Sequence, residues 1–252
     1  AAVSFLPNTM LVTALGLYIS STSVFSPRPS IALIGERNSG TTWFTNELQR
    51  CFPMVPVAPR FHRWKHWFQY PATHDPNVVV VALVRNPTTW IERMHKKPWH
   101  APNHMNLTWK EFVTRPWTMP SPQAKHARCQ EGFGPREVVP CEEGRHSGPF
   151  EANYPVYEMD PNGIPFPSVV ALRAAKLLNF QNVSHVVLRY EDLIRRGTRE
   201  VLGRIGALIK QSPRCTPALP QHRPKPKLLP EFSKWIEANV NWDAERLVGY
   251  RR

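Results

Sequence analysis

The sequence predicts an α/β fold in which a central, mostly parallel β-sheet lies between two layers of helices. Two apolar runs carry this prediction: Ile31–Gly35, and Asn77–Arg85 with its uninterrupted Val-Val-Val-Val-Ala-Leu-Val. Such runs are typical of parallel strands that are covered on both faces. A helical pattern follows each run, and strands that alternate with helices favour a layered parallel sheet. The expected architecture is therefore three-layer α/β/α.

The remaining elements follow in chain order. Thr41–Arg50 is expected to form the first helix, and Pro87 to stand in the first turn of the second, where proline is favoured. Ser184–Tyr190 predicts a third strand. Three further helices are expected at Ser168–Phe180, with Ser168 as its N-cap, at Thr198–Lys210 and at Phe232–Leu247.

The chain length suits one domain, which we expect over residues 28–252. Many of the 27 prolines lie in residues 96–166, which predicts an irregular insert rather than a second domain. Residues 1–27 contain no charged side chain and include the apolar stretch Met10–Ile19. This segment is either a membrane anchor or a segment packed on the domain.

The net charge of +13 favours an anionic partner, which could be a nucleotide, a nucleic acid, an anionic glycan or a membrane face. Two sequons, Asn106-Leu-Thr108 and Asn182-Val-Ser184, would suit a glycoprotein in a luminal compartment. The Golgi lumen, with residues 1–27 as an anchor, and the cytoplasm both remain open as locations.

The four cysteines, Cys51, Cys129, Cys141 and Cys215, contain no C-x-x-C pair, so a zinc site has little support. Cys129 and Cys141 bracket a loop with glycine and proline and could form a disulfide in an oxidising compartment. Four free thiols are the alternative.

The segment Gly35-Glu-Arg-Asn-Ser-Gly-Thr-Thr-Trp43 joins the first strand to the first helix. Its glycine spacing equals that of a Walker A loop, which predicts a P-loop NTPase-like fold with an anion held at the helix N-terminus. The Walker lysine is replaced by Thr41, however, and a kinase or ATPase needs that lysine together with magnesium. We therefore expect a less highly charged group, with Arg37 and the hydroxyls of Thr41 and Thr42 as donors.

This loop resembles the phosphosulfate-binding loop of sulfotransferases that use PAPS (3′-phosphoadenosine 5′-phosphosulfate), often written P-K-S-G-T-T-W. Ser39-Gly40-Thr41-Thr42-Trp43 matches directly, Asn38 stands at the lysine position, and Arg37 stands at the proline position. The resemblance implies that Arg37, Asn38 and these five residues bind PAPS, that PAP is released, and that no metal is required. Arg37 is expected to supply the positive charge.

Two later segments extend the resemblance. Arg85-Asn-Pro87 is similar to the start of the family's 3′-phosphate site, with Arg93 at the position of a second ligand that is serine in the family. Tyr190-Glu-Asp-Leu193 is similar to the family's Y-E-D-[LM] segment, which implies that Tyr190 contacts the adenine and that Trp43 stacks on it.

The general base is expected between the first helix and the second long strand. Lys65-His66 resembles the K-x-H element of the cytosolic enzymes, one residue shorter, and the ordinary pKa of histidine suits a base near neutrality. His66 is therefore the expected base, with Lys65 beside it. His62, Glu36 and Glu47 are rivals, and the insert is expected to shape the acceptor site.

Taken together, these segments predict a PAPS-dependent sulfotransferase that acts on a hydroxyl or amine acceptor, either an anionic glycan or a small molecule. Segments at 153–157, 172–176 and 242–250 look like those of algal and bacterial sulfotransferase-like proteins. A P-loop nucleotide kinase is the first alternative. A non-catalytic nucleic-acid-binding protein is the second, with Arg60–Trp67 as its candidate surface, although no nucleic-acid partner is expected.

Overall fold

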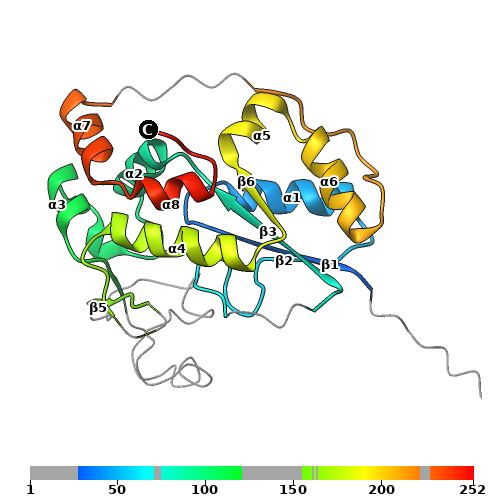
Figure 1. Cartoon of the computed structure of the whole chain (residues 1–252), viewed down its shortest axis with the longest axis horizontal. Helices are drawn as coiled ribbons and strands as arrows, with labels where there is room; N and C mark the ends of the chain where they lie inside the picture. Colours follow the sequence, from blue (N-terminus) through cyan, green and yellow to red (C-terminus); the bar gives the residue numbers. More distant parts are fainter. Residues whose placement is uncertain (1–27, 71–74, 121–154, 161, 163, 222–227) are drawn as a thin grey trace, which may run out of the picture.

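The computed structural model describes residues 28–70, 75–120, 155–160, 162, 164–221 and 228–252 (Figure 1). Its main sheet has four strands, all parallel, in the order β2-β1-β3-β6. Their bounds are β1 Ser30–Gly35, β2 Val57–Ala58, β3 Val78–Val84 and β6 Val186–Arg189. The predicted α/β class with a parallel sheet is confirmed.

Helices cover both faces of this sheet. Successive side chains of a strand point to opposite faces, and in β1 both sets are buried, as the apolar run predicted. Leu33 packs in a cluster with residues of α1 (Thr41–Cys51) and α6 (Arg199–Ile209). Ile34 packs on the other side with Phe180 and Val183 of α4 (Val169–Val183).

The helices predicted from capping and proline signals are present. α2 spans Pro87–Lys96, and the side chain of Asn86 accepts hydrogen bonds from the backbone N–H groups of Thr88 and Thr89. The Ser168 hydroxyl caps α4 by accepting from the N–H of Ala171 at 3.2 Å. The third strand ends at Arg189, one residue earlier than predicted, because Tyr190 begins α5 (Tyr190–Arg196).

The single helix predicted over Phe232–Leu247 is wrong, since two helices stand there. α7 spans Pro230–Asn239, Val240 is extended, and α8 spans Trp242–Leu247. The side chain of Asn241 accepts from the N–H groups of Asp243 and Ala244, both at 3.1 Å, and so starts a new helix.

The described part of the insert, for which an irregular segment was expected, contains several short regular elements. It contains the 3₁₀ turn Pro102–His104, α3 (Trp109–Thr114) and the strands β4 (Thr118–Pro120) and β5 (Pro155–Tyr157), which pair antiparallel. A capping box between Thr108 and Glu111 starts α3. Residues 121–154, with Cys129 and Cys141, lie outside the described residues, as do residues 1–27.

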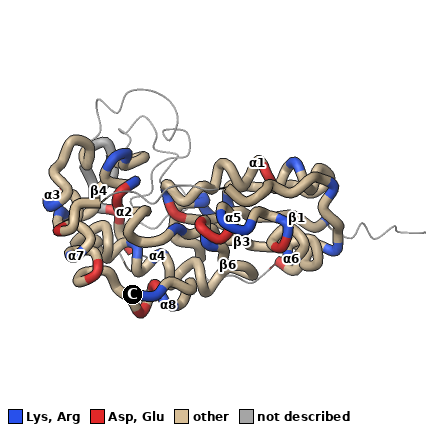
Figure 2. The backbone as a smooth tube through the Cα atoms, turned by 90° about the horizontal axis from the view of Figure 1, so that it is seen from above, with Lys and Arg blue, Asp and Glu red and all other residues tan. Residues whose placement is uncertain are grey.

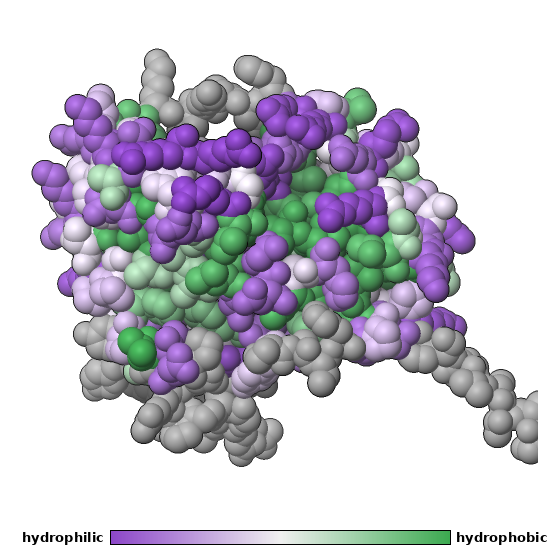
Figure 3. Space-filling view, viewed as in Figure 1, coloured by the Kyte–Doolittle hydropathy of each residue, from purple (hydrophilic) through white to green (hydrophobic). Residues whose placement is uncertain are grey.

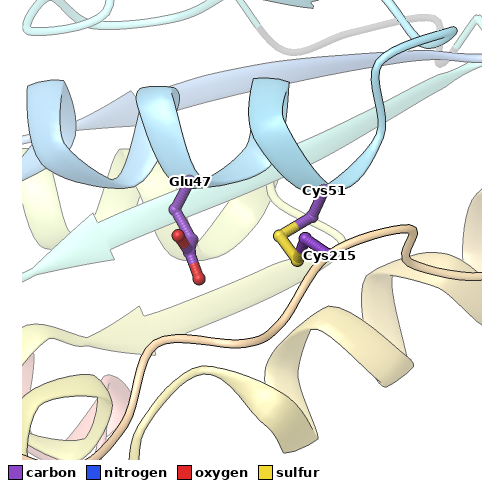
Figure 4. A group of neighbouring side chains, drawn as sticks. All are labelled: Glu47, Cys51 and Cys215. Carbon is purple, nitrogen blue, oxygen red and sulfur yellow. A yellow bond between two sulfur atoms is a disulfide. The ribbon is translucent and has the colours of Figure 1, made fainter.

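Cys51 and Cys215 form a disulfide (Figure 4). The alternative of four free thiols is therefore wrong for these two cysteines. The bond joins the end of α1 to the segment that follows α6. Glu47 lies close to both sulfur atoms, but their bond to each other removes the thiolates that a metal ion would need.

Charged residues are spread along the described chain. Figure 2 shows Lys and Arg on most elements rather than along a single stripe. In the space-filling view of Figure 3, apolar side chains gather in the middle of one face and hydrophilic ones surround them. No helix in the part of the chain that the structure describes is both long and apolar enough to span a bilayer.

Candidate active site

A cavity of about 720 Å³ opens where three parallel strands end. Its lining follows β1 at Arg37, Asn38 and Gly40–Thr42, β3 at Arg85 and β6 at Tyr190. Ligands of open parallel sheets bind outside the carboxyl ends of the strands. The full described lining is Arg37, Asn38, Gly40, Thr41, Thr42, Pro59, Trp64, Lys65, His66, Arg85, Trp99, His100 and Tyr190.

The loop between β1 and α1 contains two residues with positive φ. Asn38 has φ 61° and Gly40 has φ 90°, so the chain turns sharply before α1. The N-cap residue Gly40 offers no side-chain hydrogen bond to α1, which leaves the first N–H groups of the helix for an anion. The Asn38 amide donates to the carbonyl of Lys97 at 2.9 Å and fixes the loop against α2.

Arg85 and Tyr190 lie against this loop. The Arg85 Nη1 donates to the carbonyl of Asn38 at 3.2 Å, and its guanidinium lies 4.7 Å from the centre of the Tyr190 ring. Glu191 joins the segment after β6 to the segment after β3, because its carboxylate accepts a hydrogen bond from the N–H of Asn86 at 3.0 Å. The structure thus brings the three sequence segments, 37–42, 85–87 and 190–191, into one site.

His66, which also lines the cavity, is held in a defined orientation. Its Nδ1 lies 2.7 Å from the carbonyl oxygen of Gly35. A carbonyl only accepts, so Nδ1 carries the proton and Nε2 is left as the basic nitrogen. Burial, together with the charges of Arg37 and Lys65, holds the pKa of His66 well below its usual range. The imidazole is therefore neutral at pH 7.

Of the four candidate bases, His66 is the one that lines the described cavity. His62 is exposed, and its ring lies tilted against that of Phe61. Glu36 is a residue of the loop, and its side chain is buried in an ion pair with Arg173. Glu47 lies in α1, where its carboxylate accepts from Thr198 and Arg50.

Three predicted ligand residues lie outside the described lining. The Ser39 hydroxyl is buried and donates to the carbonyl of Glu36 at 2.6 Å, so Ser39 shapes the loop. Trp43 packs edge-on against Tyr190 with ring centres 6.3 Å apart. Arg93 is exposed on α2, away from the cavity, although it follows Arg85 by two helical turns.

The described lining carries three permanent cations, Arg37, Lys65 and Arg85, and no carboxylate. Trp64, Trp99 and His100 complete the wall near His66, and none of the three was singled out from the sequence. A basic, partly aromatic cavity suits an anionic ligand that also has a ring.

A buried ion network behind the cavity was also missed, although Glu36 itself had been named as a rival base. Arg173 of α4 pairs with Glu36 at 2.5 Å and with Glu245 of α8 at 2.5 Å, and it donates to the carbonyl of Arg85 at 2.6 Å. Burial raises the pKa of Glu36 to about 7 even though Arg173 opposes this shift. The Leu172–Lys176 and Trp242–Tyr250 segments noted in the sequence thus support the loops after β1 and β3.

Comparisons with protein-family models, curated proteins and solved structures return no match. The function is therefore argued from the geometry of the cavity.

Gly40→Ala should destabilise the protein by about 1–3 kcal/mol. A Cβ at Gly40 would lie 2.7 Å from two carbon atoms of the Tyr190 ring, and φ 90° is strained for alanine. Gly203→Ala in α6 is the matched control, because a Cβ there meets nothing within 4 Å. It should stabilise by about 0.4–1 kcal/mol in urea denaturation. Equal stabilities of the two variants would contradict the described loop.

Proposed function

We propose that this chain is a PAPS-dependent sulfotransferase with a P-loop-type three-layer fold. The observation that carries the proposal is the convergence of Arg37–Thr42, Arg85 and Tyr190 with His66 around one cationic cavity. In the sequence, the segments at 37–43, 85–87 and 190–193 each resemble a PAPS-binding motif.

In this proposal the donor lies along the three loops. The N-terminus of α1, Arg37 and the hydroxyls of Thr41 and Thr42 hold the 5′-phosphosulfate. Arg85 holds the 3′-phosphate, and Tyr190 contacts the adenine. Thr41 at the Walker lysine position favours this donor over magnesium-bound ATP.

The acceptor lies on the wall formed by Trp64, Trp99 and His100, next to His66. The Nε2 of His66 takes the proton from the acceptor hydroxyl or amine while that atom bonds to sulfur. The bond from sulfur to the 5′-phosphate oxygen breaks at the same time. PAP leaves with the bonding electrons, and the cations Arg37 and Lys65 stabilise the negative charge on its oxygen.

A transfer assay with ³⁵S-labelled PAPS and a panel of phenols, amines and glycans tests the proposal. His66→Asn keeps a donor to Gly35 but has no basic nitrogen, so we expect kcat to fall by about 10²–10⁴-fold. His62→Asn, an exposed histidine four residues away, is the control and should stay within about twofold of the unmodified rate.

The pH profile gives an independent readout. Because the pKa of His66 is lowered, kcat/KM should be level near pH 7 and fall only well below pH 6.5. Unchanged turnover in His66→Asn, or no transfer to any acceptor class, would contradict the proposal.

A further inference from the structure

A group of buried charges lies directly behind Arg37. The Nη1 of Arg37 is 3.5 Å from Oε2 of Glu158, and Oε1 of Glu158 is 2.5 Å from Nζ of Lys176. The indole N–H of Trp117 donates to Glu158 Oε2 at 2.6 Å. The three charged side chains are at most 3% exposed. The carboxylate is thus held between the loop that joins β1 to α1, helix α4 and the insert.

We propose that Glu158 is the positioning residue of Arg37, and that the insert thereby completes the donor site. Glu158 directly follows β5 and Trp117 directly precedes β4, so the two-stranded sheet of the insert carries the anchor. A second bond fixes Arg37 at its backbone, since the Trp90 indole donates to its carbonyl at 2.7 Å. This inference rests on the proposed function of the cavity.

Glu158 brings a negative charge near a site for an anion. We expect its net effect on anion binding to be favourable, because it fixes the direction of the Arg37 guanidinium. Lys176 occupies its other oxygen, so Arg37, Glu158 and Lys176 together carry one net positive charge. Burial lowers the pKa of Lys176 to about 8, with Glu158 opposing this shift. Removing Glu158 would therefore promote deprotonation of Lys176 rather than add a positive charge to the site. The main loss is the fixed direction of the Arg37 guanidinium.

A double-mutant cycle with two nucleotides tests this role. PAP carries both phosphates, whereas adenosine 3′-monophosphate lacks the 5′-phosphate that Arg37 would hold. We expect Glu158→Gln and Arg37→Ala each to weaken PAP binding at least tenfold. The double variant should bind PAP no more weakly than Arg37→Ala, because Glu158 acts through Arg37. Binding of adenosine 3′-monophosphate should change by less than twofold.

The control is Glu92→Gln, which breaks the ion pair of Glu92 with exposed Lys96 on α2 and should leave both affinities unchanged. Should Glu158→Gln fold poorly, Glu158→Gln/Lys176→Met removes both buried partners and replaces it in the cycle. Additive losses, equal losses for the two nucleotides, or unchanged PAP binding in either single variant would overturn the positioning role.

Failure of the proposed donor site can be distinguished from failure of the positioning role of Glu158. If the unmodified protein does not bind PAP, the donor assignment fails, and the same cycle is run with inorganic pyrophosphate. Non-additive loss of pyrophosphate binding then supports Glu158 as the anchor of Arg37, and unchanged or additive binding overturns it.

Discussion

Arg173→Met should cost about 3–5 kcal/mol of the free energy of unfolding. The Arg173 side chain is 1% exposed and contacts Glu36, Glu245 and the carbonyl of Arg85. Methionine fills much of the volume but leaves two buried carboxylates without their cation. Domains of this size are stable by only about 5–15 kcal/mol, so urea denaturation should reveal the loss easily.

The pH dependence of this loss has a defined sign. The pKa of Glu36 is already raised to about 7 by burial, and removing Arg173 raises it further. Above the ordinary glutamate pKa of 4.5, the folded variant therefore still binds a proton that the unfolded chain has released. Its stability falls as the pH rises from there to the raised pKa of Glu36. The deficit of Arg173→Met should be smaller at pH 5 than at pH 8.

Arg204→Met in α6 is the control, because Arg204 is exposed. It should change stability by no more than about 0.5 kcal/mol. A deficit of Arg173→Met that matches this control, or that does not vary between pH 5 and pH 8, would contradict the buried ion network.

Loss of the Cys51–Cys215 disulfide should cost up to about 5 kcal/mol, since the bond closes a loop with a sequence separation of 164 residues. The bond also secures local contacts: the N–H of Arg214 donates to the carbonyl of Cys51 at 2.8 Å, and that of Ala218 to Glu47 at 3.0 Å. Cys51→Ala/Cys215→Ala should unfold at a lower urea concentration.

Sensitivity to a reductant distinguishes the effect of this bond from any effect of the other two cysteines. In a Cys129→Ser/Cys141→Ser background, dithiothreitol should still lower the denaturation midpoint. The Cys51→Ala/Cys215→Ala variant lacks the bond, so dithiothreitol cannot lower its midpoint by reducing Cys51–Cys215. Insensitivity to dithiothreitol in the first background would show that Cys51 and Cys215 are not paired in solution.

The parts of the molecule that were predicted correctly have local signals. The apolar runs of β1 and β3 are buried on both faces, the glycine spacing of 35–40 forms a turn before α1, and Ser168 caps its helix. His66, whose short motif resembles a family element, lines the cavity, and its role as the base stays a prediction.

The parts that were missed depend on distant partners. Arg173 is 137 residues from Glu36 and 72 from Glu245, and on a helix it looks like any solvated charge. Glu158 lies in an insert whose composition suggested no regular structure, and Lys176 reaches it from α4. Arg93 is exposed and lies outside the described lining, because spacing from Arg85 does not reveal which face of α2 is turned to solvent.

Calorimetric titration of the purified protein with PAP in EDTA tests the donor site most directly, with magnesium-ATP, Arg85→Ala and Arg93→Ala for comparison. We expect metal-independent binding of PAP, a loss of about 10–150-fold in Arg85→Ala from the removal of charge-assisted bonds worth about 1.5–3 kcal/mol, and little change in Arg93→Ala. Absence of PAP binding, or preferential binding of magnesium-ATP, would contradict a sulfotransferase and favour a nucleotide kinase.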